Sequence, residues 1–139
     1  MKKKAILRLA FILAVFMMLF TIAFAAEESS AYIGAMNGYF TRSGNDVNIY
    51  FSIVGRHVMD EIGVSEILLF EKNGNTWSKV YTFDSADPAY TDDMLSYNTS
   101  AKADHVTYAG SASSDYLAIL YFYAADAYGS DTIPYYSYS

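Results

Sequence analysis

The apolar run at residues 115–125 (Asp-Tyr-Leu-Ala-Ile-Leu-Tyr-Phe-Tyr-Ala-Ala) does most to limit what this chain folds into. It is the longest apolar run outside the N-terminus, and no charged residue interrupts it after Asp115. Turn-forming residues at 113–114 and 128–130 bound it. Such a run is typical of a strand that is buried on one face and largely covered on the other. We therefore predict a central strand here, with the other strands packed around it.

Regular alternation marks a second strand at residues 47–54. The side chains in the phase expected to face the core are Val47, Ile49, Phe51 and Ile53. Further along, Asn73-Gly74-Asn75 predicts a hairpin between strands at 65–72 and 76–83, because Asn and Gly tolerate the positive φ of tight hairpin turns.

Shorter segments complete a set of seven short strands, in which a brief return to the sheet at 94–97 is not counted. The remaining strand candidates are 31–41, 94–97 (a brief one), 105–108 and 131–139. The predicted connections are 42–46, 55–63, 84–93, 98–104 and 109–114. Within the second of these, Met59 and Ile62 are spaced as on one helical turn and are expected to plug one end of the core. Short strands with turn residues between them predict an all-β, antiparallel seven-stranded sandwich.

The N-terminus has the three parts of a secretory signal: Lys2, Lys3 and Lys4, an apolar segment at 9–20, and Ala23-Phe24-Ala25. We expect a signal helix cleaved after Ala25, which leaves 26–139 as a single domain. The alternative is an uncleaved signal anchor, because the apolar stretch 9–26 is close to the minimum that spans a bilayer. The expected localisation is therefore secreted or, in the alternative, tethered to the membrane.

Charge and cysteine content narrow the range of partners. Without residues 1–25, five Lys or Arg stand against fifteen Asp or Glu, a net charge of −10. An acidic chain without a basic stripe argues against nucleic acid and against anionic membrane surfaces. There is no cysteine, so disulfides do not contribute and the core must supply the stability.

The order of these segments resembles that of immunoglobulin-like and fibronectin type III-like sandwiches. Tyr116, which starts the penultimate strand, resembles the tyrosine corner of those folds. The residues that follow it in the same phase are Ala118, Leu120, Phe122 and Ala124. The segment Met-Asp-Glu-Ile-Gly at 59–63 is also similar to one in small secreted sandwich proteins of Gram-positive bacteria. The resemblance implies a fold but no activity, because such sandwiches have many unrelated functions.

Metal ligands are sparse. A zinc site would need both histidines, His57 and His105, plus carboxylates from distant strands; we expect instead that His57 lies in a loop and His105 on an exposed strand position. The candidate calcium ligands are Asp84, Asp87, Asp92 and Asp93, which fall within ten residues. Their spacing matches no EF-hand, and the alternative is a set of solvated loop carboxylates. No cofactor is expected.

No pattern of catalytic residues is visible. No serine sits in Gly-x-Ser-x-Gly, and no histidine is placed by a motif to act as a base. Asp60 and Glu61 are sequence neighbours rather than partners across a cleft, so a glycosidase has no support. We expect a protein that is not an enzyme.

Aromatic residues dominate the composition, with fourteen Tyr, five Phe and one Trp in 26–139. If the Tyr116 phase faces the core, then Leu117, Ile119, Tyr121 and Tyr123 face outward. Neighbouring strands are expected to add Leu68, Phe70, Tyr81 and Tyr135 to this face. The binding-face candidates are therefore Tyr121, Tyr123, Phe70, Tyr81 and Tyr135. The alternative is that these side chains form cross-strand pairs that stabilise a sandwich without disulfides.

These observations predict a secreted, non-catalytic interaction module that binds an extracellular protein or glycan through an outward aromatic face. One alternative is a structural or self-associating protein, in which edge strands near 31 or 131 pair between chains. Another is a carbohydrate-binding module that uses Trp77 and tyrosines as stacking platforms. Contact with a membrane is expected only through an uncleaved signal segment.

Overall fold

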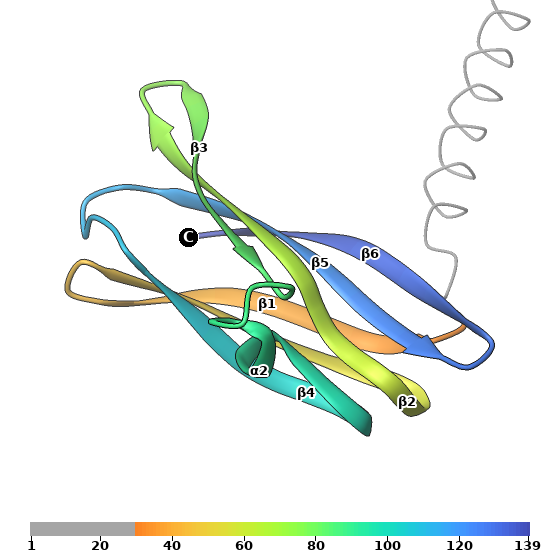
Figure 1. Cartoon of the computed structure of the whole chain (residues 1–139). Coiled ribbons are helices and arrows are strands. Elements are labelled where there is room, and N and C mark those ends of the chain that lie inside the picture. Colours follow the sequence, from red (N-terminus) through yellow and green to blue (C-terminus); the bar gives the residue numbers. More distant parts are fainter. Residues whose placement is uncertain (1–29) are drawn as a thin grey trace, which may run out of the picture.

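The computed structural model describes residues 30–139, which form an all-β antiparallel fold. The predicted signal segment, 1–25, lies outside the described residues. The described part of the chain contains six strands and one short helix, which Figure 1 labels. They are β1 (Ile33–Ser43), β2 (Asp46–Asn73), β3 (Thr76–Asp84), α2 (Thr91–Met94), β4 (Leu95–Ala109), β5 (Tyr116–Asp126) and β6 (Gly129–Tyr138).

β2 is a single strand of 28 residues that runs through the whole fold. It unites two segments predicted as separate strands, so the predicted connection at 55–63 is wrong. Glycine and charged residues give that segment the composition of a loop, yet its backbone finds partners on both sides. Glu61, for example, lies opposite Tyr97 of β4 and Ala125 of β5. Pairing with both neighbours satisfies backbone groups that a loop would leave to water.

β4 departs from the prediction in the same way. It unites the candidates at 94–97 and 105–108, so the predicted loop at 98–104 is wrong. Asn98 has a φ of +52°, a conformation that Asn tolerates better than most residues. Six strands therefore result rather than seven, because two of the seven predicted strands merge in β2 and the brief candidate at 94–97 joins 105–108 in β4. All six belong to one hydrogen-bonded sheet, which curls because β2 carries bulges near residues 54–59 and 64–66.

The curled sheet has two halves that face each other across the core (Figure 1). The β1 half consists of β1, residues 46–54 of β2 and residues 101–109 of β4. The β6 half consists of β3, residues 61–73 of β2, β5 and β6. β1 and β6 meet where Ser137 Oγ donates a hydrogen bond of 3.1 Å to the Gly38 carbonyl.

The predicted inward phases are confirmed. Val47, Ile49, Phe51 and Ile53 are each at most 2% exposed. On β5 the inward residues are Tyr116, Ala118, Leu120, Phe122 and Ala124. Burial of each large aliphatic or aromatic side chain contributes about 1.5–3 kcal/mol. Met59 and Ile62 are fully buried as expected, but on a strand rather than on a helical turn.

Glycines are required at two hairpin turns and at one close approach. Gly44 and Gly74 have φ of +61° and +64° in the turns between β1 and β2 and between β2 and β3, so both predicted turns are confirmed. Gly63 lies where β2 passes the start of β4. A Cβ at this position would be 1.9 Å from the Met94 carbonyl oxygen, so only glycine fits there.

Candidate functional site

The outer face of the β6 half carries a continuous apolar surface. Directly opposed residues of an antiparallel pair point to the same side of a sheet, so the register defines its rows. The outward residues of β5 are Leu117, Ile119, Tyr121 and Tyr123, as predicted from the alternation. All four are partly exposed.

The register extends this face over four strands. Ile119 lies opposite Leu68 of β2 on one side and Tyr136 of β6 on the other. One row along, Leu117 lies opposite Phe70 and Tyr138. The full apolar set is Leu68, Phe70, Trp77, Leu117, Ile119, Tyr121, Tyr123, Pro134, Tyr136 and Tyr138. We call this set the outer apolar face.

Its most exposed members lie on the edge strands. Tyr136 is 57% exposed and Tyr138 is 65% exposed. Trp77 on β3 meets Tyr138 edge to face, with 6.1 Å between ring centroids, and the Lys72 ammonium lies 5.9 Å from the Trp77 ring centroid. The aromatic rings thus continue across the sheet at the end near the β2–β3 hairpin.

The charges on this face are unevenly distributed, because both lysines lie at the hairpin end beside Asp115 and only carboxylates lie at the other end. Lys72 and Lys79 lie at the hairpin end, where Lys79 is opposite Phe70. Glu66 and Asp84 lie directly opposite each other at the other end. Glu61 is further along β2 in the same direction. Burial raises the pKa of Tyr123, and the negative charge of Glu61 raises it further. The apolar rows lie between the two charged ends.

Tyr81 is not on the outer apolar face, which corrects the prediction. It lies opposite the fully buried Leu69, in the inward phase. The register of β3 shifts between the partners of Leu69 and Phe70. Tyr81 and Lys79 therefore face opposite sides, although residues two positions apart in a regular strand face the same side. Tyr81 packs on Phe83, and its hydroxyl shares a hydrogen bond of 2.6 Å with that of Tyr90. That bond, with burial adding to it, raises the pKa of Tyr90 to about 12.

Tyr135 also faces inward, which is a second correction. It lies opposite the buried Leu120 and meets Phe122 edge to face. Its hydroxyl donates a hydrogen bond of 3.1 Å to Asn37 Oδ1 on β1. Tyr135 therefore links the two halves, and the structure brings only Tyr121, Tyr123 and Phe70 of the five candidates together on one surface.

Sequence reasoning missed Tyr136 and Tyr138, the most exposed tyrosines of this face. A signal was present: if Ala127 and Tyr128 form a two-residue turn, Asp126 opposes Gly129 and the register of the whole β5–β6 pair follows. The predicted β2–β3 hairpin also indicates which charged residues of the two strands lie at each end of this face. It does not predict the bulge in β3.

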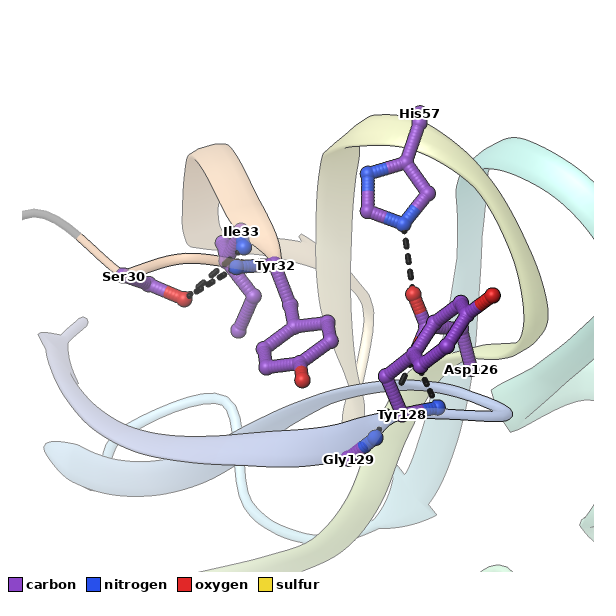
Figure 2. A network of polar contacts seen from close by, with 7 residues as sticks. All are labelled: Ser30, Tyr32, Ile33, His57, Asp126, Tyr128 and Gly129. Carbon is purple, nitrogen blue, oxygen red and sulfur yellow. Dashed lines mark hydrogen bonds and ion pairs between the residues drawn. The ribbon is translucent and has the colours of Figure 1, made fainter.

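A polar cluster lies where the described chain begins (Figure 2). His57 donates from Nε2 to Asp126 Oδ2 over 2.7 Å, and Asp126 Oδ1 accepts from the backbone N–H groups of Tyr128 and Gly129. The His57 bond, followed by these backbone bonds, holds the pKa of Asp126 below its ordinary value. His57 thus lies on β2, not in a loop as predicted. The cluster ties the bend of β2 to the β5–β6 turn.

The contacts of the His57 ring can be compared with those of a catalytic histidine. A histidine base needs a nucleophile within hydrogen-bond reach. Within residues 30–139, the His57 ring has a hydrogen bond to Asp126 alone. His105 occupies an exposed strand position as predicted, with its ring stacked 4.7 Å from that of Tyr50.

The four calcium candidates do not form one group of ligands: two accept hydrogen bonds within turns and two lie on α2. Asp84 Oδ1 accepts from the Ala86 N–H and Asp87 Oδ1 from the Ala89 N–H, each over 2.9 Å. Asp92 and Asp93 lie exposed in the first turn of α2. In the described part of the chain, no three His, Asp or Glu side chains converge as metal ligands would.

Comparisons with protein-family models, curated proteins and solved structures found no significant match. No helix within residues 30–139 is long and apolar enough to cross a membrane.

Proposed function

We propose that this protein is a secreted, non-catalytic interaction module that binds another macromolecule through the outer apolar face. The observation that carries the proposal is the continuity of this face. Rows of apolar side chains cross β2, β5 and β6, Trp77 extends the face onto β3, and the charged groups lie toward the two ends. Contiguous exposed apolar surface of this kind usually marks an interaction site.

Tyrosine suits such a role because it combines apolar area with a hydroxyl that forms hydrogen bonds. At the edge of the face, Tyr136 and Tyr138 expose ring surface and hydroxyl to solvent. The N-terminal signal pattern supports an extracellular setting for the partner, whether the module is released or tethered.

We also propose kinship with immunoglobulin-like and fibronectin type III-like sandwiches. Support comes from Tyr116, whose hydroxyl accepts a hydrogen bond of 2.9 Å from the Ser111 N–H, five residues upstream. A tyrosine corner makes the same kind of bond to the backbone a few residues upstream.

Paired substitutions test the proposed function. The chain produced by a secreting host is immobilised and exposed to extracellular proteins and cell-surface glycans from a culture. We expect Tyr121→Ser with Tyr123→Ser to abolish retention, while Tyr39→Ser, on the outer face of the β1 half, leaves it unchanged. Equal retention by both variants would refute the proposal, and a purely structural role predicts that the double variant loses stability without losing any binding.

A further inference from the structure

The charged ends of the outer apolar face are complementary to each other. Lys72 and Lys79 are two of the five cationic residues in 26–139, and both lie at the hairpin end. Asp115 of β5, whose carbonyl oxygen accepts a hydrogen bond from the Lys72 N–H, lies at the same end, so the net charge there is 2 − 1 = +1. Glu66, Asp84 and Glu61 lie at the opposite end. From Lys72 to Glu66 is six residues along one strand, or about 20 Å. A surface with opposite charges at its two ends matches its own copy after a rotation of 180°.

Lys72, Lys79, Glu61 and Glu66 lack ion-pair partners in the described part of the chain. Glu66 and Asp84 are directly opposed across β2 and β3, and like charges so placed destabilise a sheet. Cations from outside the chain would relieve this repulsion, and the same surface carries two at its other end.

We infer that the outer apolar face binds a second copy of this chain, in a two-fold arrangement that places the Lys72 and Lys79 end of each copy over the Glu61, Glu66 and Asp84 end of the other. The inference rests on the proposed function, namely that this face is a binding surface, and names its partner. The apolar rows around Ile119 and Leu68 lie midway between the charged ends and pack on themselves about the axis. A two-fold axis of this kind is the commonest symmetry of protein dimers.

The size of the face sets the expected strength. Four strands about 4.8 Å apart and about 20 Å long give roughly 400 Å² of flat surface. This is below the ~800 Å² per partner that stable complexes bury, so the dimer is weak and depends on concentration. The charged ends then contribute most to the orientation of the two copies.

Charge exchange tests the arrangement. One variant carries Lys72→Glu and Lys79→Glu, and the other carries Glu61→Lys and Glu66→Lys. When either variant pairs with its own copy, like charges lie over like charges, so its dimer dissociation constant is expected to be at least ten times that of the original chain. Mixed in equal amounts, the two variants have complementary ends and form a heterodimer at least as tight as the original dimer.

Net charge does not explain such a result. The second variant brings the charge of residues 26–139 from −10 to about −6, which lessens general repulsion. Repulsion between whole molecules thus predicts stronger self-association for this variant, whereas the proposed interface predicts weaker. Circular dichroism and thermal unfolding of each variant show whether it is folded.

Sedimentation over about 10 µM to 1 mM gives the readout. The protein is the form that a secreting host releases, or the detergent-extracted full chain if the N-terminal segment is retained. A monomer over the whole range, or dimers that both variants form as readily as the original chain, overturns the inference. If the chain is monomeric but Tyr121→Ser with Tyr123→Ser still abolishes retention of an extracellular ligand, the proposed function stands and only the second copy is excluded.

Discussion

The two halves of the sheet both expose aromatic side chains, but in different ways. On the outer face of the β1 half, Tyr39, Tyr50 and His105 lie in one row across β1, β2 and β4. Their rings stack, with 5.2 Å between the centroids of Tyr39 and Tyr50 and 4.7 Å between those of Tyr50 and His105. Each inner ring surface is therefore covered by a neighbour from the same chain.

The surroundings of this stack are polar. The next row contains Thr41, Asn48 and Thr107, and Thr107 Oγ1 donates a hydrogen bond of 2.7 Å to Asn48 Oδ1. In the outer apolar face of the β6 half, by contrast, a row of directly opposed residues consists of Leu68, Ile119 and Tyr136.

The difference teaches how to interpret an exposed tyrosine. Stacked rings between polar rows are cross-strand pairs that stabilise the sheet, each contributing up to about 1.5 kcal/mol. Aromatic rings within apolar rows leave hydrophobic area in water, which a partner would remove. Exposure alone does not distinguish them, since Tyr39 is 49% exposed and Tyr136 is 57% exposed.

The largest effect is expected where β2 passes between the halves. Gly63→Ala places a Cβ against the Met94 carbonyl oxygen, so β2 and β4 must move apart, and we expect a loss of about 3 kcal/mol or more in unfolding free energy. Denaturant unfolding followed by Trp77 fluorescence measures it. Gly44→Ala is the control: it has an open position and a φ of +61°, and costs about 1–2 kcal/mol. Equal costs for the two variants would contradict this account.

Tyrosine substitutions on the two outer faces should have opposite consequences. Tyr50→Ser removes both contacts of the ring stack and is expected to cost about 1–2 kcal/mol in unfolding free energy, without weakening association. Tyr136→Ser is expected to change stability by less than about 0.5 kcal/mol and to weaken association. Thermal unfolding and sedimentation of both variants provide the measurements. The comparison is refuted if both variants lose stability and neither loses association.

A buried tyrosine extends the comparison to the inner surface. Tyr116→Phe leaves the ring in the core but removes the acceptor of the Ser111 N–H, so we expect a loss of about 1 kcal/mol in unfolding free energy. Tyr108→Phe is the matched control, because the Tyr108 hydroxyl makes no hydrogen bond within residues 30–139. Urea unfolding of the two variants decides; an equal effect would mean that the corner bond adds nothing.

The smallest effect concerns the polar cluster at the end of the molecule. The lowered pKa of Asp126 means that its contribution to stability is present above the ordinary carboxyl pKa of 3.8 and is lost as pH falls through the lower folded-state value. We therefore expect Asp126→Asn to flatten the decline of the melting temperature below about pH 4. Asp60→Asn, on an exposed part of β2, serves as control. A decline equally steep in both variants would argue against the Asp126 contribution.

Local patterns were sufficient for β5 and for the first part of β2, where apolar residues alternate clearly. The alternation of Val47, Ile49, Phe51 and Ile53 identified the core side of β2, and the run from Tyr116 identified β5 and its outward residues. Glycine identified the hairpin turns at Gly44 and Gly74, because a positive φ is a property of single residues. The separate connections assigned to 55–63 and 98–104 failed because their pairing depends on strands distant in the sequence.

By itself, the sequence determined the all-β class, the inward phases of β2 and β5 and the outward phase of Leu117, Ile119, Tyr121 and Tyr123, since these follow from period-two burial. Only the tertiary structure decided which tyrosines share a face. One extra residue in β3 turns Tyr81 inward, and the register of β6 does the same to Tyr135. Because side chains alternate with a period of two, a shift of one residue moves every following side chain to the other face, and such a shift depends on contacts between strands.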